Sequence, residues 1–194
     1  FMNRAADTDA RFLSLVQWAR EQGAFRVNSH EQESYSADKA TMHLELISAG
    51  LHTPYTIILA PCSEQPELPD LDLSPLGDSF AIKPALGGGG QGVVLEATNH
   101  NQVQQARQLF PDDKYLVQAH VEPKLLASRP AWFRVIYCVG EVFVSWWPPE
   151  THVYHPVTKD DVVRYGLGAL YDMAVRIGDV CRLHLFSTEI ALTR

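Results

Sequence analysis

The sequence lacks a surplus of positive charge. Its 194 residues contain 16 Lys and Arg against 23 Asp and Glu, which gives a formal net charge of -7. Sequence-independent binding to a phosphate backbone depends on a basic surface. We therefore predict that nucleic acid is not a partner of this protein.

Long apolar runs are also missing. The two longest apolar stretches, residues 51–61 and 132–144, are interrupted by polar residues. Both are shorter than the roughly 20 apolar residues that cross a bilayer as a helix. The start of the chain has no basic region followed by an apolar run and a cleavage site. We therefore expect no membrane partner, no secretory signal and a cytoplasmic location.

Cysteine is scarce as well. Cys62, Cys138 and Cys181 are widely spaced, without a CxxC pair and without histidines at the spacing of a zinc site. We expect all three to be ordinary buried or half-buried thiols.

The sequence does have the composition of a soluble globular protein. Hydrophobic residues make up 46% and charged residues 20%, and the length suits one domain or two small lobes that share a cleft. Periodicity and turn residues predict helices and strands that alternate, with hairpins among them, which is an α+β organisation. The expected helices include 36–50, with Ser36 as the N-cap, 99–109 and a long helix over 162–177. The expected strands are 55–59, 80–82, 93–95, 115–121, 132–139, 141–147 and 182–192, with Gly140-Glu141 at one hairpin turn.

A glycine-rich segment, Gly87 to Gly92, lies between two of these expected strands. Its glycines satisfy GxGxxG, but a dinucleotide-binding loop opens into a helix, whereas Val93-Val94-Leu95 here indicate a strand. A Walker A loop needs Lys and then Ser or Thr after the last glycine, and Val93 stands there. A plain glycine-rich hairpin stays open, although ordering four consecutive glycines costs backbone entropy.

We favour a mobile lid that folds over a polyphosphate and donates backbone N–H groups to it. Lys83 lies on the strand that enters the loop, from which a compact ammonium could reach the same phosphates.

The segment 80–95 resembles the lysine strand and phosphate lid of ATP-grasp enzymes. The segment from Ala37-Asp38-Lys39 to Pro54 is similar to the entry to the central subdomain of that family. The resemblance implies an ATP-grasp fold, in which two α/β lobes hold ATP between antiparallel sheets. It also implies that Lys39 and Lys83 contact the phosphates. The lid residues carried over from the family are Gly88, Gly89, Gly90, Gln91 and Gly92.

Downstream, residues 116–122 resemble the strand and hinge that hold adenine in this family. The resemblance extends the nucleotide site to Gln118, makes the backbone of Ala119, His120 and Val121 the adenine hinge, and makes Glu122 the acceptor for the ribose hydroxyls.

Two further segments resemble catalytic strands of the family. Residues 132–135 are similar to a strand whose arginine faces the phosphates or the acyl group, so Arg134 is the candidate for stabilising charge during phosphoryl transfer. Residues 186–191 resemble the strand of the first magnesium carboxylate, which makes Glu189 the candidate Mg²⁺ ligand. A surface ion pair for Arg134 and a solvent-facing Glu189 stay open as alternatives.

The resemblance also predicts how the chain is divided. Residues 1–35 would be the remnant of an amino-terminal substrate lobe with its linker, 36–117 the central and lid subdomain, and 118–194 the carboxy-terminal subdomain. The family's second metal carboxylate and an Asn follow a few residues after the first ligand, beyond Arg194. We therefore expect the catalytic site within this sequence to be incomplete.

Three functions remain open. The leading one is a ligase that uses ATP and Mg²⁺ to activate a small-molecule or peptide carboxylate as an acyl phosphate, which an amine or a thiol then attacks. The second is a kinase of the same fold, for which Asp160 or Asp161 would have to supply a general base. The third is a module that binds nucleotide without turnover. A homodimer is an open alternative for its assembly.

Overall fold

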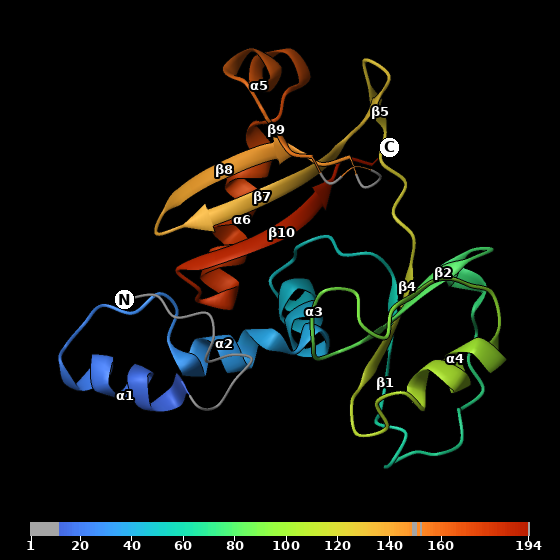
Figure 1. The fold of residues 1–194 in the computed structure, drawn as a ribbon. Coiled ribbons are helices and arrows are strands. Elements are labelled where there is room, and N and C mark those ends of the chain that lie inside the picture. Colours follow the sequence, from blue (N-terminus) through green and yellow to red (C-terminus); the bar gives the residue numbers. More distant parts are fainter. Residues whose placement is uncertain (1–11, 149–150, 152, 194) are drawn as a thin grey trace. The chain divides into compact units, whose positions relative to one another are not determined.

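The computed structural model describes residues 12–148, 151 and 153–193, and they form two compact units (Figure 1). One unit spans residues 35–121 and contains the glycine-rich segment, so we call it the glycine-loop unit. The other combines the described residues before Tyr35 with those after Val121 and is called the terminal unit. The chain therefore begins in the terminal unit, passes through the glycine-loop unit and then returns to the terminal unit.

The glycine-loop unit is built on a four-stranded antiparallel sheet. The strand order is β1 (Thr56–Leu59), β4 (Tyr115–Ala119), β2 (Phe80–Pro84) and β3 (Val94–Ala97). Helix α3 (Lys39–Ser48) contacts β4, whereas α4 (His100–Arg107) contacts β2 and β3. The two helices lie on opposite sides of the sheet (Figure 1). A short 3-10 helix, η2 (Ser74–Leu76), lies in the connector between β1 and β2.

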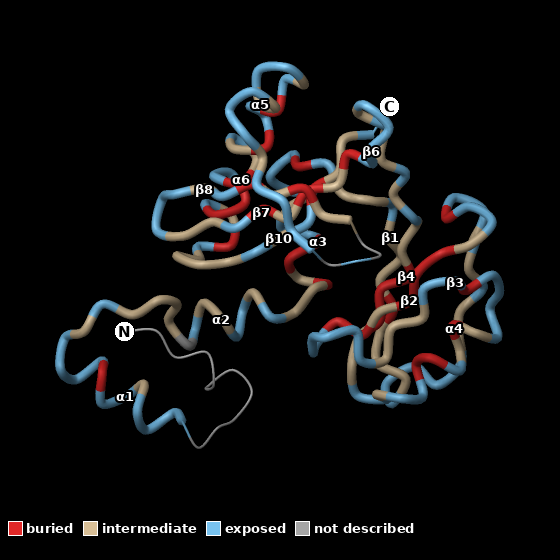
Figure 2. The backbone as a smooth tube through the Cα atoms, turned by 45° about the horizontal axis from the view of Figure 1, so that its top comes forward, coloured by how far each residue is buried: buried red, intermediate tan, exposed pale blue. Residues whose placement is uncertain are grey.

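The core of this unit has two faces. The larger cluster lies on the α4 side and includes Phe80 and Ile82 of β2 with Tyr115 and Val117 of β4. The smaller cluster joins Ala40 of α3 to Leu116 and Ala85. Because side chains of a strand point alternately to the two faces, β2 and β4 are covered on both sides. Figure 2 shows this burial along the two central strands.

Short polar side chains begin the helices of this unit. Asn99 accepts from the backbone N–H of Gln102 and caps α4, as the sequence predicts. The prediction that Ser36 caps the next helix is wrong, because Ser36 lies inside α2 (His30–Ala37). The cap of α3 is Asp38, whose carboxylate accepts from the N–H groups of Ala40 and Thr41.

The terminal unit is built on a second antiparallel sheet. The strand order is β10 (Leu185–Ala191), β7 (Trp132–Cys138), β8 (Glu141–Trp146) and β9 (His155–Pro156). Helix α6 (Gly168–Cys181) packs against β7 and β8 and lies behind the sheet in Figure 1. The remaining elements are α1 (Leu13–Glu21), α2, the hairpin of β5 (Leu125–Leu126) and β6 (Arg129–Pro130), and α5 (Lys159–Tyr165).

Two predictions about this unit are corrected. The single helix expected over 162–177 is divided, because Gly166 adopts the left-handed conformation with φ 66° and ends α5. The hairpin turn consists of Val139 and Gly140, with φ of 49° and 93°, since Cys138 pairs with Glu141. No helix among the described residues combines the length and apolar character that a membrane crossing requires.

The segment before α2 is attached to β10 by one amide side chain. Asn28 Oδ1 accepts from the backbone N–H groups of His184 and Leu185, at 2.7 and 2.9 Å. Its Nδ2 donates to the carbonyl oxygen of Leu185 at 2.8 Å. The Phe25 ring also contacts the His184 ring, with centroids 5.1 Å apart.

We predict that Asn28→Ala lowers the free energy of unfolding of the terminal unit by about 1–3 kcal/mol, because it leaves partly buried backbone groups unpaired. All four tryptophans lie outside residues 35–121, so denaturant unfolding followed by tryptophan fluorescence reports this unit. Gln22→Ala, at the exposed C-cap of α1 in the same unit, is the matched control. Equal stability of the two variants would contradict the proposed attachment.

Candidate functional site

Lys83 lies near the end of β2, on the face of the sheet that α3 covers. Its neighbour Ile82 belongs to the core on the α4 side, so alternation places Lys83 on the opposite face. There the ammonium donates to Gln118 Oε1 at 2.7 Å. Gln118 Nε2 in turn donates to Thr56 Oγ1 at 2.9 Å, and that hydroxyl donates to the Pro54 carbonyl at 2.9 Å. A chain of hydrogen bonds across three strands therefore orients the ammonium.

Lys39 occupies the first position of α3 and holds the entry to the glycine loop. Its ammonium lies within hydrogen-bonding distance of four successive carbonyl oxygens, those of residues 84–87, at 3.3, 3.2, 3.3 and 2.6 Å, and its three N–H donors are shared among them. Burial lowers the pKa of Lys39, while Asp113 and Asp38 act in the opposite direction. The structure thus gives the two predicted phosphate lysines different partners: Lys83 donates to the Gln118 side chain, and Lys39 donates to backbone oxygens of the four residues that follow Lys83.

Two more groups fasten the same entry. The Ala85 N–H donates to the Lys114 carbonyl at 2.8 Å, and the Leu86 N–H donates to Asp113 Oδ2 at 2.9 Å. Lys114 also forms an ion pair with Asp38. Burial acts to raise the pKa of Asp38, but hydrogen bonds from Lys114 and Thr41 hold it below its usual value. Our sequence analysis assigned no role to Asp113 or Lys114.

The tip of the glycine loop has far less support than its entry. The backbone bonds there are long, with Gln91 N–H to Gly88 O at 3.5 Å and Val93 N–H to Gly90 O at 3.2 Å. A Cβ atom at Gly88 would meet nothing within 4 Å. Gly92 differs, because its Cβ would lie 2.6 Å from Phe110 Cε2. The loop therefore has a fixed base on each side and an open tip.

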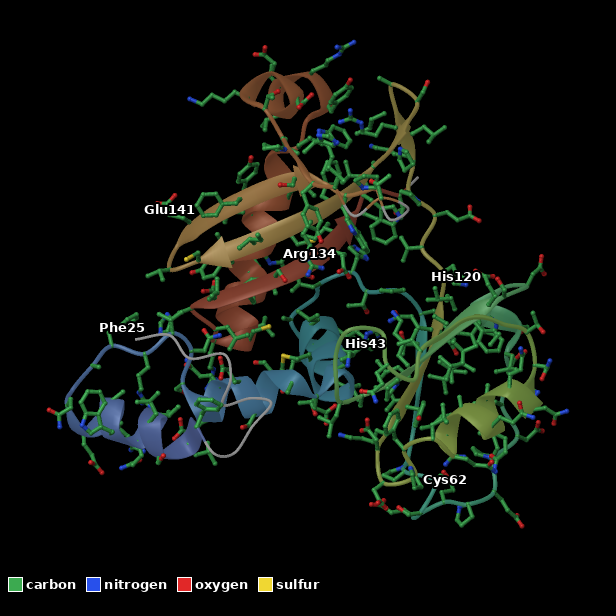
Figure 3. The ribbon with its side chains drawn as sticks, viewed as in Figure 1. Phe25, His43, Cys62, His120, Arg134 and Glu141 are labelled. Carbon is green, nitrogen blue, oxygen red and sulfur yellow. The ribbon has the colours of Figure 1, made fainter. Side chains whose placement is uncertain are left out.

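The predicted adenine hinge follows β4, which ends at Ala119. Ala119 itself still donates to the Tyr55 carbonyl at 2.9 Å. Beyond it, the backbone N–H groups of His120 and Val121 are paired with no other described residue. Backbone donors and acceptors without partners at a strand end can hold the edge of a heterocycle. His120, labelled in Figure 3, follows β4. Its Nε2 atom lies 3.9 Å from Glu96 Oε1. Glu122 is exposed.

Arg134 and Glu189, chosen separately from the sequence, are direct partners in the terminal unit. Arg134 on β7 lies opposite Glu189 on β10, and the two side chains form an ion pair. Their neighbours Phe133 and Ile190 are buried, so alternation places the pair on the other face of the sheet, away from α6. Figure 3 shows Arg134 on β7. The surface ion pair held open above is therefore present.

A protein-held metal site is not formed by the described residues, among which no group of three or more His, Cys, Asp or Glu comes together. Glu189 supplies one carboxylate. Magnesium at nucleotide sites uses one or two carboxylates beside the substrate phosphates. One protein carboxylate is the smallest number that such a magnesium site uses. Glu189 alone therefore fits a magnesium ion whose remaining ligands come from a nucleotide and from water.

The general-base candidates for a kinase have other surroundings. Asp161 forms a capping box with Thr158 at the start of α5, and Trp146 Nε1 lies 3.5 Å from its carboxylate. Backbone and side-chain hydrogen bonds from Thr158 lower the pKa of Asp161, which makes it a poor base. Asp160 is exposed in the same turn.

We predict that Gly92→Ala destabilises the glycine-loop unit by about 1–3 kcal/mol, because the new methyl group meets Phe110 and the residue keeps φ of 73°. Gly88→Ala adds the same methyl group in open space and should change stability by less than about 1 kcal/mol. Hydrogen exchange of β2 and β4 measures both. Similar losses of protection in the two variants would contradict this account of the lid base.

The fold resembles that of several solved ligases. D-alanine–D-alanine ligase from Bacillus anthracis, in a complex with ATP, matches with a TM-score of 0.64 at 10% identity, over 93% of this chain and 57% of its own. L-amino acid ligase from Bacillus licheniformis matches at 0.61 and 14%, over 92% and 42%. ATP-grasp ligase PsnB, with its precursor peptide and AMPPNP, matches at 0.57 and 14%, over 98% and 61%.

This chain thus spans less than two thirds of each of these ligases. No family model matches the sequence, and no curated protein sequence matches it. At these identities the likeness concerns the fold. Two antiparallel sheets with helices on their faces confirm the predicted α+β class. The chain has the ATP-grasp fold, as its lysine strand and glycine loop indicated.

Proposed function

We propose that this chain is the ATP-binding region of an ATP-dependent ligase that activates a carboxylate as an acyl phosphate. The observation that carries the proposal is the arrangement in the glycine-loop unit. There an oriented lysine, a lid with a fixed base and an unpaired hinge backbone all belong to one sheet. The lysine suits a single phosphate group of ATP, the lid suits the whole triphosphate, and the hinge backbone suits the edge of adenine.

We assign each of these residues a contact with one part of ATP. The ammonium of Lys83 would bind a phosphate as a point charge, with Gln118 holding it in place. The lid residues Gly88–Gly92 would donate backbone N–H groups to the phosphates and exclude water. The backbone of residues 119–121 would hold adenine, and Glu122 would accept from the ribose hydroxyls.

The substrates we propose are a small-molecule or peptide carboxylate and an amine or thiol. Solved ligases of this fold named for D-alanine and L-amino acids, and one complexed with a precursor peptide, support this class. We assign Arg134 the role of stabilising negative charge on the transferred phosphate. Glu189 would bind a magnesium ion that neutralises the nucleotide phosphates.

The ion pair of Arg134 and Glu189 favours a second candidate, a module that binds nucleotide without turnover. A carboxylate held by a guanidinium is a weaker metal ligand, and the guanidinium is equally engaged. The pair is partly exposed, with 27% and 43% of the two side chains accessible. Breaking the Arg134–Glu189 ion pair should therefore cost about 1 kcal/mol or less. The binding energy of a magnesium nucleotide could offset this cost.

We predict that Lys83→Ala weakens ATP binding about 10-fold to 100-fold, the loss expected for one charge-assisted hydrogen bond. Isothermal titration calorimetry with Mg²⁺ present measures it. Lys159→Ala removes the same charge at an exposed position of α5 and should leave affinity unchanged. If folded wild-type protein binds no ATP, or if both variants bind like wild type, the assignment of Lys83 is wrong.

Glu189→Gln separates the two candidate functions. For a ligase site we expect Mg²⁺ to tighten ATP binding to the wild type, and we expect this gain to fall by about tenfold in the variant, because one metal ligand is lost. Glu141→Gln, an exposed carboxylate on β8 of the same sheet, is the control. Equal gains from Mg²⁺ in all three proteins would favour the module that binds without turnover.

A further inference from the structure

A histidine behind Lys83 has no place in the function proposed so far. His43 lies on α3 with only 7% of its surface accessible. Histidine is the side chain whose charge changes most readily near neutral pH, so its place beside a charged group has consequences for binding. Figure 3 shows His43 on the helix that covers the lysine face of the sheet.

The helix and strand geometry places His43 on that face. Ala40 packs against Leu116 and Ala85, and His43 follows it by three residues, so both lie on the same side of α3. Leu116 is the direct cross-strand partner of Lys83. The imidazole and the ammonium therefore approach the same part of the sheet from the helix and from the strand.

The surroundings of His43 contain little other charge. Apart from Lys83, the side chains that β1, β4 and β2 place on this face are neutral, namely Thr56, Ile58, Ala81, Leu116 and Gln118. Glu96 of β3 is exposed and lies 3.9 Å from His120. Lys39 and Asp38 lie one turn earlier on the helix, but Lys39 is bound to carbonyl oxygens and Asp38 to Lys114. Glu45 accepts from Tyr35. The charge that acts on His43 is that of Lys83, which adds to burial in lowering the pKa of the imidazole.

We propose that His43 takes up a proton when a polyphosphate binds at Lys83, so that nucleotide binding at this site is linked to pH. This inference rests on the proposed ATP site. In the free protein, burial and the nearby ammonium keep the imidazole neutral. A bound polyphosphate brings several negative charges to Lys83, cancels the repulsion and favours the imidazolium. His43 is thereby a positioning residue, since it acts through the field at Lys83.

The sign of the effect follows from linkage. If the complex binds more protons than the free protein, affinity rises as the pH falls through the pKa of the imidazole in the complex, and it levels off below the lowered pKa of the free protein. One extra proton corresponds to at most about a tenfold change in affinity per pH unit. The terminal phosphate of ATP also titrates near this range. The relevant quantity is therefore the difference between the wild type and a variant without the imidazole.

Calorimetry of Mg-ATP binding at about pH 6.5, in buffers of different ionisation enthalpy, measures the proton uptake. We expect the wild type to take up about 0.5 proton more per ATP than His43→Gln, which is the most that a pKa rise of about one unit can give. His52→Gln, an exposed histidine after α3, should match the wild type. Equal uptake by wild type and His43→Gln while both bind ATP would overturn the inference and leave the proposed function intact. Absence of ATP binding to the wild type would overturn both.

A second measurement does not depend on the stability of the His43 variant. In wild-type protein, the pKa of the His43 ring follows from its NMR titration, assigned by comparison with the variant. Adding inorganic tripolyphosphate should raise this pKa by about one unit, and Lys83→Met should raise it without any ligand. A pKa that neither change moves identifies His43 as a packing residue and overturns the inference.

Discussion

The side chains of β2 alternate between two faces that are both covered by helices, and this alternation decides where the Lys83 ammonium lies. Ile82 anchors the strand in the α4 core, which forces Lys83 to the α3 face. Gln118 and Thr56 reach that face through the register of β4 and β1, and His43 reaches it from α3. The apolar core thus fixes where Lys83, Gln118 and Thr56 lie. The hydrogen bonds among these three side chains are too weak to define the fold by themselves.

The glycine loop depends on the same framework at its base. Residues 84–87 are bound by Lys39, the Lys114 carbonyl and the Asp113 carboxylate, while the tip has only long turn bonds. The backbone carbonyl oxygens around the Lys39 ammonium already stabilise its positive charge. A phosphate would therefore compete with the loop backbone for Lys39. The two lysines are therefore not equivalent: Lys83 is oriented by a side chain, and Lys39 supports the loop.

The charged residues of the terminal unit differ from those of the glycine-loop unit in their surroundings. Arg134 and Glu189 meet because β7 and β10 pair in one register, and 27% and 43% of their side chains are accessible. Charges at a partly exposed position exchange partners at little cost. Buried charges such as Arg107, whose guanidinium donates to the Ala60 and Gln65 carbonyls, serve to hold a connector. Arg107 is therefore a charge that maintains the fold, whereas Arg134 and Glu189 keep access to solvent.

The sequence by itself determined the strands around the glycine loop, the cap at Asn99, the α+β class and the ATP-grasp fold, because these follow from local periodicity, turn residues and a distinctive motif. It misplaced the start of α3 and the break at Gly166, where a competing cap and a left-handed glycine decided the outcome. Only the tertiary structure paired Arg134 with Glu189, attached Gln118 to Lys83 and placed His43 behind it. These contacts join residues distant in sequence, and strand register and helix packing set them.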